Sequence, residues 1–151
     1  MLEALQHSAV ATTIGNSLLL LAGLSALHVV GFALVSGGAL VSNLRLLGVL
    51  FPDRPIAEIV VPTRRGMATG LLISVVTGLL LFSTRATAAS GNQFFQMKMT
   101  LLVAAVLMQF VLQRRLVDLR PEAATFRGAG AVGLALWLGV GLAGCAFILL
   151  E

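Results

Sequence analysis

A single histidine, His28, stands in the apolar stretch LSALHVVGFALVSGG, which covers residues 24–38. An imidazole can ligate a metal ion or a haem iron, or carry a proton, and away from water each of its ring nitrogens needs a partner. On a helix, Ser25 and Gly31 would share a face with His28. Gly31 leaves space on that face, which a flat ligand or the backbone of a neighbouring helix would fill.

Three interpretations of His28 compete. It is a packing residue hydrogen-bonded to Ser74, Thr77 or a backbone carbonyl; or an axial ligand of haem b, held in a helical bundle; or part of a relay for protons or metal ions. No other histidine lies in an apolar run. The second axial ligand of a haem would therefore be Met67, Met108 or the His28 of another copy, or would be missing.

A second group of reactive side chains lies in QFFQMKMTLL, residues 93–102. Lys98 is a few residues inside an apolar run, where its stem can carry the ammonium to the membrane surface. Alternatively, the ammonium points inward and meets an anion such as a haem propionate. Met97 and Met99 flank it, and thioether sulfur together with imidazole suits copper(I). These two methionines and His28 are therefore the candidate metal ligands.

The composition indicates whether the helices or strands that position these residues lie in water or in lipid. Of 151 residues, 58% are hydrophobic and 11% charged, and the mean hydropathy is +1.02, whereas a soluble domain is about 25% charged. Four apolar runs, at 17–42, 66–83, 94–113 and 128–150, are each long enough for a helix to cross a bilayer. They show no alternating polar face, which excludes barrel strands. The predicted fold class is an all-α integral membrane four-helix bundle.

Basic residues are distributed unevenly between the two sides of the predicted bundle. Eight arginines lie in the connections that follow the first and third runs: Arg45, Arg54, Arg64, Arg65, Arg114, Arg115, Arg120 and Arg127. The other side carries only Arg85 and Lys98. The positive-inside rule then places both termini on the outer, periplasmic side of a bacterial inner membrane.

The predicted topology is up and down over residues 17–150. Residues 1–16 are expected to form a short amphipathic lead-in on the outer surface. The proline-rich connection between the first two runs predicts only a short turn around residues 56–60.

Small residues recur at four-residue spacing in two of the runs. The second run carries Gly66, Gly70, Ser74 and Gly78, and the fourth carries Ala129, Gly133, Gly141 and Cys145 around Trp137. In lipid, such rows allow two helix backbones to approach closely. We interpret both as packing surfaces within one chain.

Arg45 follows the first run, in SNLRLLG. At this position a guanidinium serves as an anchor to lipid head groups. It could also pair with Asp118 or Glu122 of the other arginine-bearing connection.

Four segments of the chain resemble an uncharacterised family of small bacterial four-span membrane proteins, loosely similar to the copper-resistance D type and to haem-associated membrane bundles. The segments are LHVVGFALVSGGALVSNLRLLG, TGLLLFSTRAT, NQFFQMKMTLLVAAVL and QRRL. The resemblance implies the four-span fold and a cofactor site that includes His28, Gly31, Arg45 and Lys98. Asn43 stands in place of an acid of that family and Gln113 in place of a histidine, so one chain does not supply two histidine ligands.

Composition and spacing also limit the function. The net charge of +4 does not predict nucleic-acid binding, because the basic residues lie beside the ends of the runs and contact lipid. No acid lies within a run and no nucleophile has a neighbouring base, so we do not expect an enzyme. We expect a membrane electron-transfer or anchoring subunit that binds haem b through His28 and joins other membrane subunits or a second copy. The alternative is a small transporter or channel for copper or protons that uses His28, Met97 and Met99.

Overall fold

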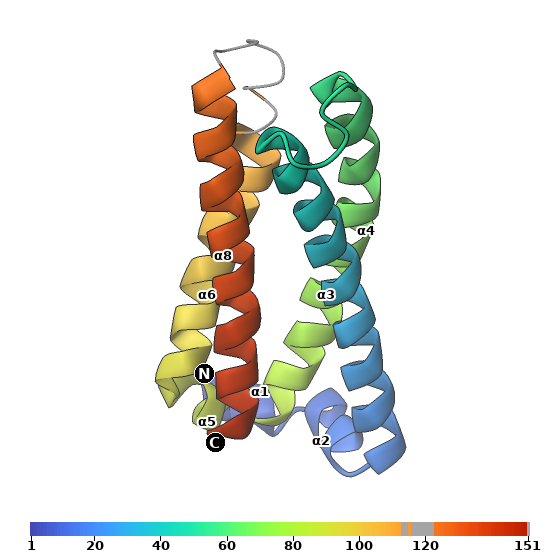
Figure 1. Ribbon diagram of the computed structural model, residues 1–151. Helices are drawn as coiled ribbons and strands as arrows, with labels where there is room; N and C mark the ends of the chain where they lie inside the picture. Colours follow the sequence, from blue (N-terminus) through green and yellow to red (C-terminus); the bar gives the residue numbers. More distant parts are fainter. Residues whose placement is uncertain (113–114, 116–122, 151) are drawn as a thin grey trace.

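The computed structural model describes residues 1–112, 115 and 123–150, and the regular structure in these residues is entirely helical. The helices are α1 (Leu2–Gln6), α2 (Ala9–Gly15), α3 (Leu18–Leu46), α4 (Ile56–Thr84), α5 (Ala86–Gly91), α6 (Gln93–Val106), the π-helix η1 (Leu107–Leu112) and α8 (Ala123–Leu149). Figure 1 shows the long helices running up and down beside one another, with both termini at the end that holds α1, α2 and α5.

Four helices are long and apolar enough to cross a membrane, which confirms the predicted number. They are Leu18–Leu46, Ile56–Thr84, Gln93–Val111 and Thr125–Leu149. The first two extend beyond the predicted runs toward the connection at residues 47–55, since helical hydrogen bonding continues into the polar residues that flank an apolar run. The architecture is therefore an all-helical up-and-down bundle.

Helix α4 passes through Pro62, where the sequence predicts only a short turn at residues 56–60. Pro55 is the N-cap, a position at which the fixed φ and missing N–H of proline are tolerated. Pro62 leaves the carbonyl of Glu58 without its helical donor. Because Glu58 is exposed, water can replace that donor, and the helix continues.

Local hydrogen bonds explain where several helices begin and end. Ser17 caps α3 by accepting a hydrogen bond from the backbone of Leu20 at 3.3 Å. Asn92 caps α6 in the same way, with Phe94 as donor at 2.9 Å. Two residues after α3, Gly48 adopts φ +80°, a left-handed conformation that suits glycine and turns the chain out of the helix.

The closest helix contact joins α3 and α4 through the predicted small residues. A Cβ atom added at Gly31 would lie 2.9 Å from the carbonyl oxygen of Gly70, and one added at Gly70 would lie 2.7 Å from that of Gly31. The row continues with Ser74 and Gly78, which also face α3. Gly66, by contrast, has no neighbour within 4 Å. Most of the predicted row is thus a packing surface within the chain.

Glycines on α8 face two different helices. Gly133 and Gly141 lie against α3, whereas Gly139 and Gly144 lie against α6. Helices α3 and α4 form one closely packed pair and α6 and α8 a second, and the pairs meet where α3 contacts α8.

The amino-terminal residues fold onto one end of the bundle as two short helices. Ala11 and Ile14 of α2 are buried, with 2% and 7% of their surface exposed. The side-chain carbonyl of Gln6 accepts a hydrogen bond from the hydroxyl of Thr87 at 2.7 Å. The lead-in is therefore attached to the bundle itself.

Candidate functional site

His28 faces α4, where its ring lies beside Thr77. Nδ1 lies 3.1 Å from the hydroxyl oxygen of Thr77. That hydroxyl also lies 2.7 Å from the carbonyl oxygen of Ile73, and when it donates its proton there it accepts from His28. In that tautomer Nδ1 carries the ring proton and Nε2 keeps its lone pair. The ring also interacts with the backbone of Ser74.

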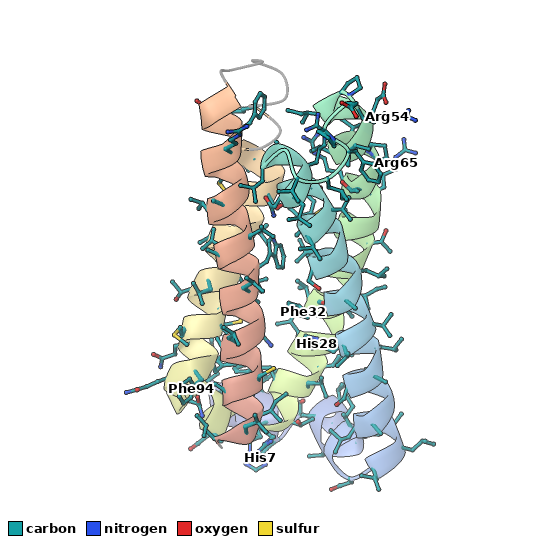
Figure 2. The ribbon with its side chains drawn as sticks, viewed as in Figure 1. His7, His28, Phe32, Arg54, Arg65 and Phe94 are labelled. Atoms are coloured by element: carbon teal, nitrogen blue, oxygen red, sulfur yellow. The ribbon has the colours of Figure 1, made fainter. Side chains whose placement is uncertain are left out.

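The hydrogen bond between His28 and Thr77 is one of the contacts predicted for a packing histidine, and it is confirmed. A hydrogen bond on the opposite nitrogen is the usual way in which proteins orient a metal-binding histidine. Figure 2 shows His28 one turn from Phe32 on α3.

The two glycines near His28 have different neighbours. Gly78 makes room for the imidazole, because a Cβ atom there would lie 3.0 Å from Cε1 of His28. Helix α4 fills the space beside Gly31, since a Cβ atom there would lie 2.7 Å from Oγ of Ser74 and 2.9 Å from the carbonyl oxygen of Gly70. The space beside Gly31 is thus occupied by a neighbouring backbone, which is the second of the two predicted occupants, and not by a flat ligand.

Lys98 lies across α8. A Cβ atom added at Gly144 would be 3.6 Å from both Cε and Nζ of Lys98. The ammonium is close enough to His28 to interact with it electrostatically. Lys98 has no hydrogen bond or ion pair with any residue that the structure describes. This position corresponds to the inward-pointing alternative rather than to extension toward the surface.

Helix contacts place His28 and Lys98 at a similar depth. Gly141 of α8 packs against the ring of Phe32, with a Cβ atom there 3.6 Å from Cζ. His28 lies one turn from Phe32, and Gly144 lies about one turn from Gly141 in the same direction, because α3 and α8 run antiparallel (Figure 1). We call this layer, comprising His28, Thr77, Gly78, Lys98 and Gly144, the His28 layer.

The predicted copper ligands on α6 remain largely exposed. Met97 and Met99 have 46% and 41% of their surface exposed, whereas Lys98 between them is half-buried. Within the described ranges, no group of three or more His, Cys, Asp and Glu residues could hold a metal ion. The structure therefore adds no support for a copper site formed with His28.

Neither methionine considered as a second haem ligand lies in the His28 layer. Met67 packs against Gly38, ten residues from His28 on α3, a separation of about 15 Å along the helix. Met108 lies ten residues beyond Lys98, again roughly 15 Å away. Two residues that hold one haem must lie at the same depth, so neither Met67 nor Met108 could hold a haem together with His28.

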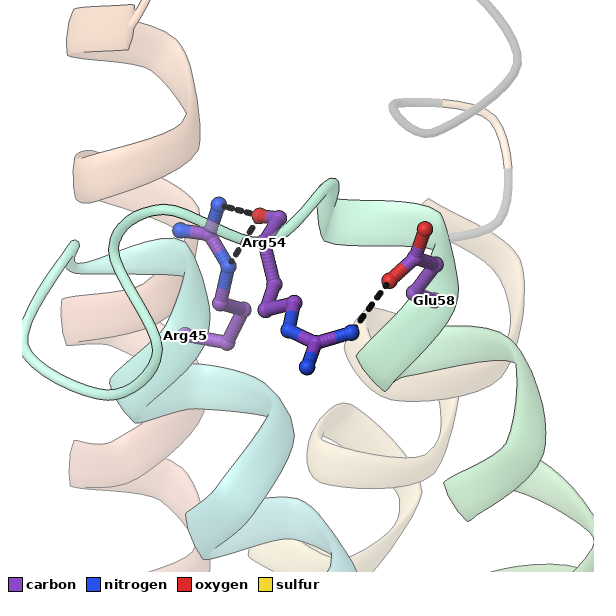
Figure 3. A network of polar contacts seen from close by, with 3 residues as sticks. All are labelled: Arg45, Arg54 and Glu58. Atoms are coloured by element: carbon purple, nitrogen blue, oxygen red, sulfur yellow. Dashed lines mark hydrogen bonds and ion pairs between the residues drawn. The ribbon is translucent and has the colours of Figure 1, made fainter.

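Arg45 holds the connection that follows α3. Its Nε donates to the carbonyl oxygen of Arg54 at 3.1 Å, and its Nη2 donates to the carbonyl oxygens of Pro52 at 3.3 Å and of Arg54. Arg54 also forms an ion pair with Glu58 at 3.7 Å (Figure 3). Only 8% of the Arg45 surface is exposed.

Arg45 is therefore neither an exposed head-group anchor nor part of the His28 layer. It lies seventeen residues from His28, about 25 Å along α3. The acids proposed as its partners, Asp118 and Glu122, lie outside the described residues.

A second polar layer, near Arg45, was missed. The side-chain amide of Asn43 donates to that of Gln109 at 3.2 Å, and the hydroxyls of Ser42 and Thr63 lie 2.8 Å apart. Asn43 and Gln109 are 0% and 3% exposed. The available signal was one amide inside an apolar run, Gln109, and one directly after a run, Asn43, since buried amides require partners.

Buried apolar residues separate the two polar layers on every long helix. They are Val35, Ala39, Met67, Ala105, Trp137 and Val140. The interior therefore alternates between a polar layer, an apolar layer and a second polar layer.

The comparisons with known proteins agree with part of the expected resemblance. No curated protein and no solved structure matches the chain, and no similarity to copper-resistance or haem proteins is found. A family model described as a family of unknown function, DUF6644, matches residues 7–144, which is most of the chain. The chain therefore belongs to the DUF6644 family of unknown function.

Proposed function

We propose that this chain is a multi-pass protein of the bacterial inner membrane that serves as an electron-transfer or anchoring subunit. The four long apolar helices support insertion. The arginines cluster at the end opposite the termini, as Figure 2 illustrates with Arg54, Arg65 and His7. That distribution favours cytoplasmic connections and periplasmic termini.

The candidate cofactor is haem b, bound through Nε2 of His28. The observation that carries this proposal is the hydrogen bond between His28 and Thr77, because with Nδ1 as the donor the lone pair of Nε2 is available for a metal. Lys98 brings an unpaired ammonium to the same depth, which suits a propionate. A bound haem would supply one-electron redox chemistry.

A second axial ligand would come from outside the chain. Met67 and Met108 each lie about 15 Å from the His28 layer. His28 of a second copy or a residue of another membrane subunit is therefore the proposed partner ligand.

The visible spectrum of the purified protein tests the haem proposal. Protein from haem-replete cells should show a Soret band that shifts on reduction with dithionite. His28→Ala should lose the band, whereas His7→Ala, which changes the only other histidine, should keep it. Thr77→Val should weaken haem retention by about tenfold to a hundredfold, because Nδ1 loses its partner. A colourless protein, or a band equally strong in His28→Ala, would refute haem binding at this site.

Copper or proton transport is the weaker alternative. A transport path needs polar groups or water across the membrane. The apolar layer formed by Val35, Met67, Trp137 and their neighbours interrupts the polar interior between the two polar layers. This arrangement favours a bound cofactor over a conducted ion.

A further inference from the structure

An apolar groove lies between α3 and α8, at the level of the buried apolar residues that separate the two polar layers. Its volume is about 450 Å³, within the range of small-molecule sites. Its walls include Phe32, Ser36, Gly37, Trp137, Leu138 and Gly141. None of the lining residues is charged.

One hydrogen-bond donor in the groove wall has no acceptor. Trp137 is 5% exposed, and no partner for its indole Nε1 is found among the described residues. The other polar side chain of the wall, Ser36, donates to the carbonyl oxygen of Phe32 at 2.8 Å. Leaving a buried N–H unpaired is unfavourable, so an acceptor brought by a ligand would be stabilised here.

The depth of Trp137 limits which molecule can bring that acceptor. Trp137 is near the middle of α8, about 20 Å from either end of the helix. Phospholipid head groups and ester carbonyls lie at the membrane surfaces, and water is scarce in the hydrocarbon layer. The acceptor must therefore belong to a molecule that dissolves in hydrocarbon.

We propose that this groove binds a hydrocarbon-soluble ring compound that carries a carbonyl acceptor, of the quinone class, through a hydrogen bond from Trp137. The groove is lined by a glycine on each helix, Gly37 on α3 and Gly141 on α8, and the open space at Gly37 leaves room for a flat ring. Phe32 and Trp137 place aromatic rings beside it, with centroids 6.5 Å apart. Because neighbouring atoms cover Nε1 of Trp137, a ligand in the groove must displace side chains of the groove wall to reach it. This site does not depend on the proposed haem.

Trp137 itself reports on the groove, because the chain has one tryptophan and no tyrosine. We would titrate the purified protein in dodecyl maltoside with ubiquinone-1, a short-chain quinone, and follow quenching of the indole fluorescence. Wild-type protein should show saturable quenching. Gly37→Leu should abolish saturation, because Gly37 has no neighbour within 4 Å and a leucine side chain there enters the groove. Gly23→Leu is the matched control: Gly23 also has no neighbour within 4 Å but does not line the groove.

A second variant tests the hydrogen bond separately from the shape of the groove. Trp137→Phe keeps an aromatic ring and removes the donor. After gel filtration, it should retain about threefold to tenfold less ubiquinone-1 than wild type, measured by extraction and absorbance. Quenching that rises linearly and equally in Gly37→Leu and Gly23→Leu would mean that the quinone only dissolves in detergent, and would overturn the proposal. Equal retention by Trp137→Phe and wild type would overturn it as well.

Discussion

Substitution of Gly70 by alanine tests the contact that joins α3 to α4. The new Cβ atom would lie 2.7 Å from the carbonyl oxygen of Gly31, 2.7 Å from Cβ of Leu34 and 2.9 Å from the backbone nitrogen of Val35. These atoms cannot rotate away, so reaching an ordinary contact near 3.4 Å requires the helices to separate by several tenths of an ångström. Such overpacking costs about 1–3 kcal/mol.

Gly66→Ala is the matched control, because Gly66 lies one turn earlier on α4 and has no neighbour within 4 Å. Both variants gain the helix propensity of alanine, about 1 kcal/mol, so their difference isolates the packing cost. We would unfold both with sodium dodecyl sulfate and follow circular dichroism and Trp137 fluorescence. Gly70→Ala should be about 1–3 kcal/mol less stable than Gly66→Ala. Equal unfolding midpoints would show that α3 and α4 do not approach as closely as the structure places them.

Two further predictions concern the end of the bundle that holds Arg45. Asn43→Leu should reduce the free energy of unfolding by about 1–3 kcal/mol, because the buried amide of Gln109 loses the hydrogen bond from Asn43. A double-mutant cycle with Gln109→Leu should show coupling, and additive losses would contradict the contact. Arg45→Met should increase hydrogen exchange in residues 47–55, since the carbonyls of Pro52 and Arg54 lose their donors, while unchanged exchange would exclude this role.

The number and approximate position of the long helices could be predicted from the sequence, because the thickness of a bilayer sets a minimum length for an apolar run. The ends could not. Pro62 argues against a helix when considered alone, yet α4 continues through it because the unpaired carbonyl of Glu58 faces outward. The sequence shows that a proline removes a helical hydrogen bond. It does not show whether the carbonyl that loses this bond is exposed to water.

The candidate site was predictable only in part. The cost of an unpaired imidazole identifies His28 and suggests Thr77, but the contact of the ring with Gly78 depends on how α3 and α4 cross. Arg45 shows the same limit. Its position in the sequence indicates a lipid contact, whereas in the structure it donates to backbone carbonyls of the connection that follows α3. Periodicity indicates which residues share a face, and it does not indicate which helix covers that face.

The pairing of the long helices fits the order in which a ribosome makes them. Helices α3 and α4 are consecutive long helices and pack most closely, so this hairpin can assemble before the rest of the chain has been made. The partners of the Asn43 side chain, Gln109 and the surface at Gly133, are synthesised later. Until they are made, the Asn43 side chain lacks these two contacts. Docking of α6 and α8 onto α3 would therefore be a late step of assembly.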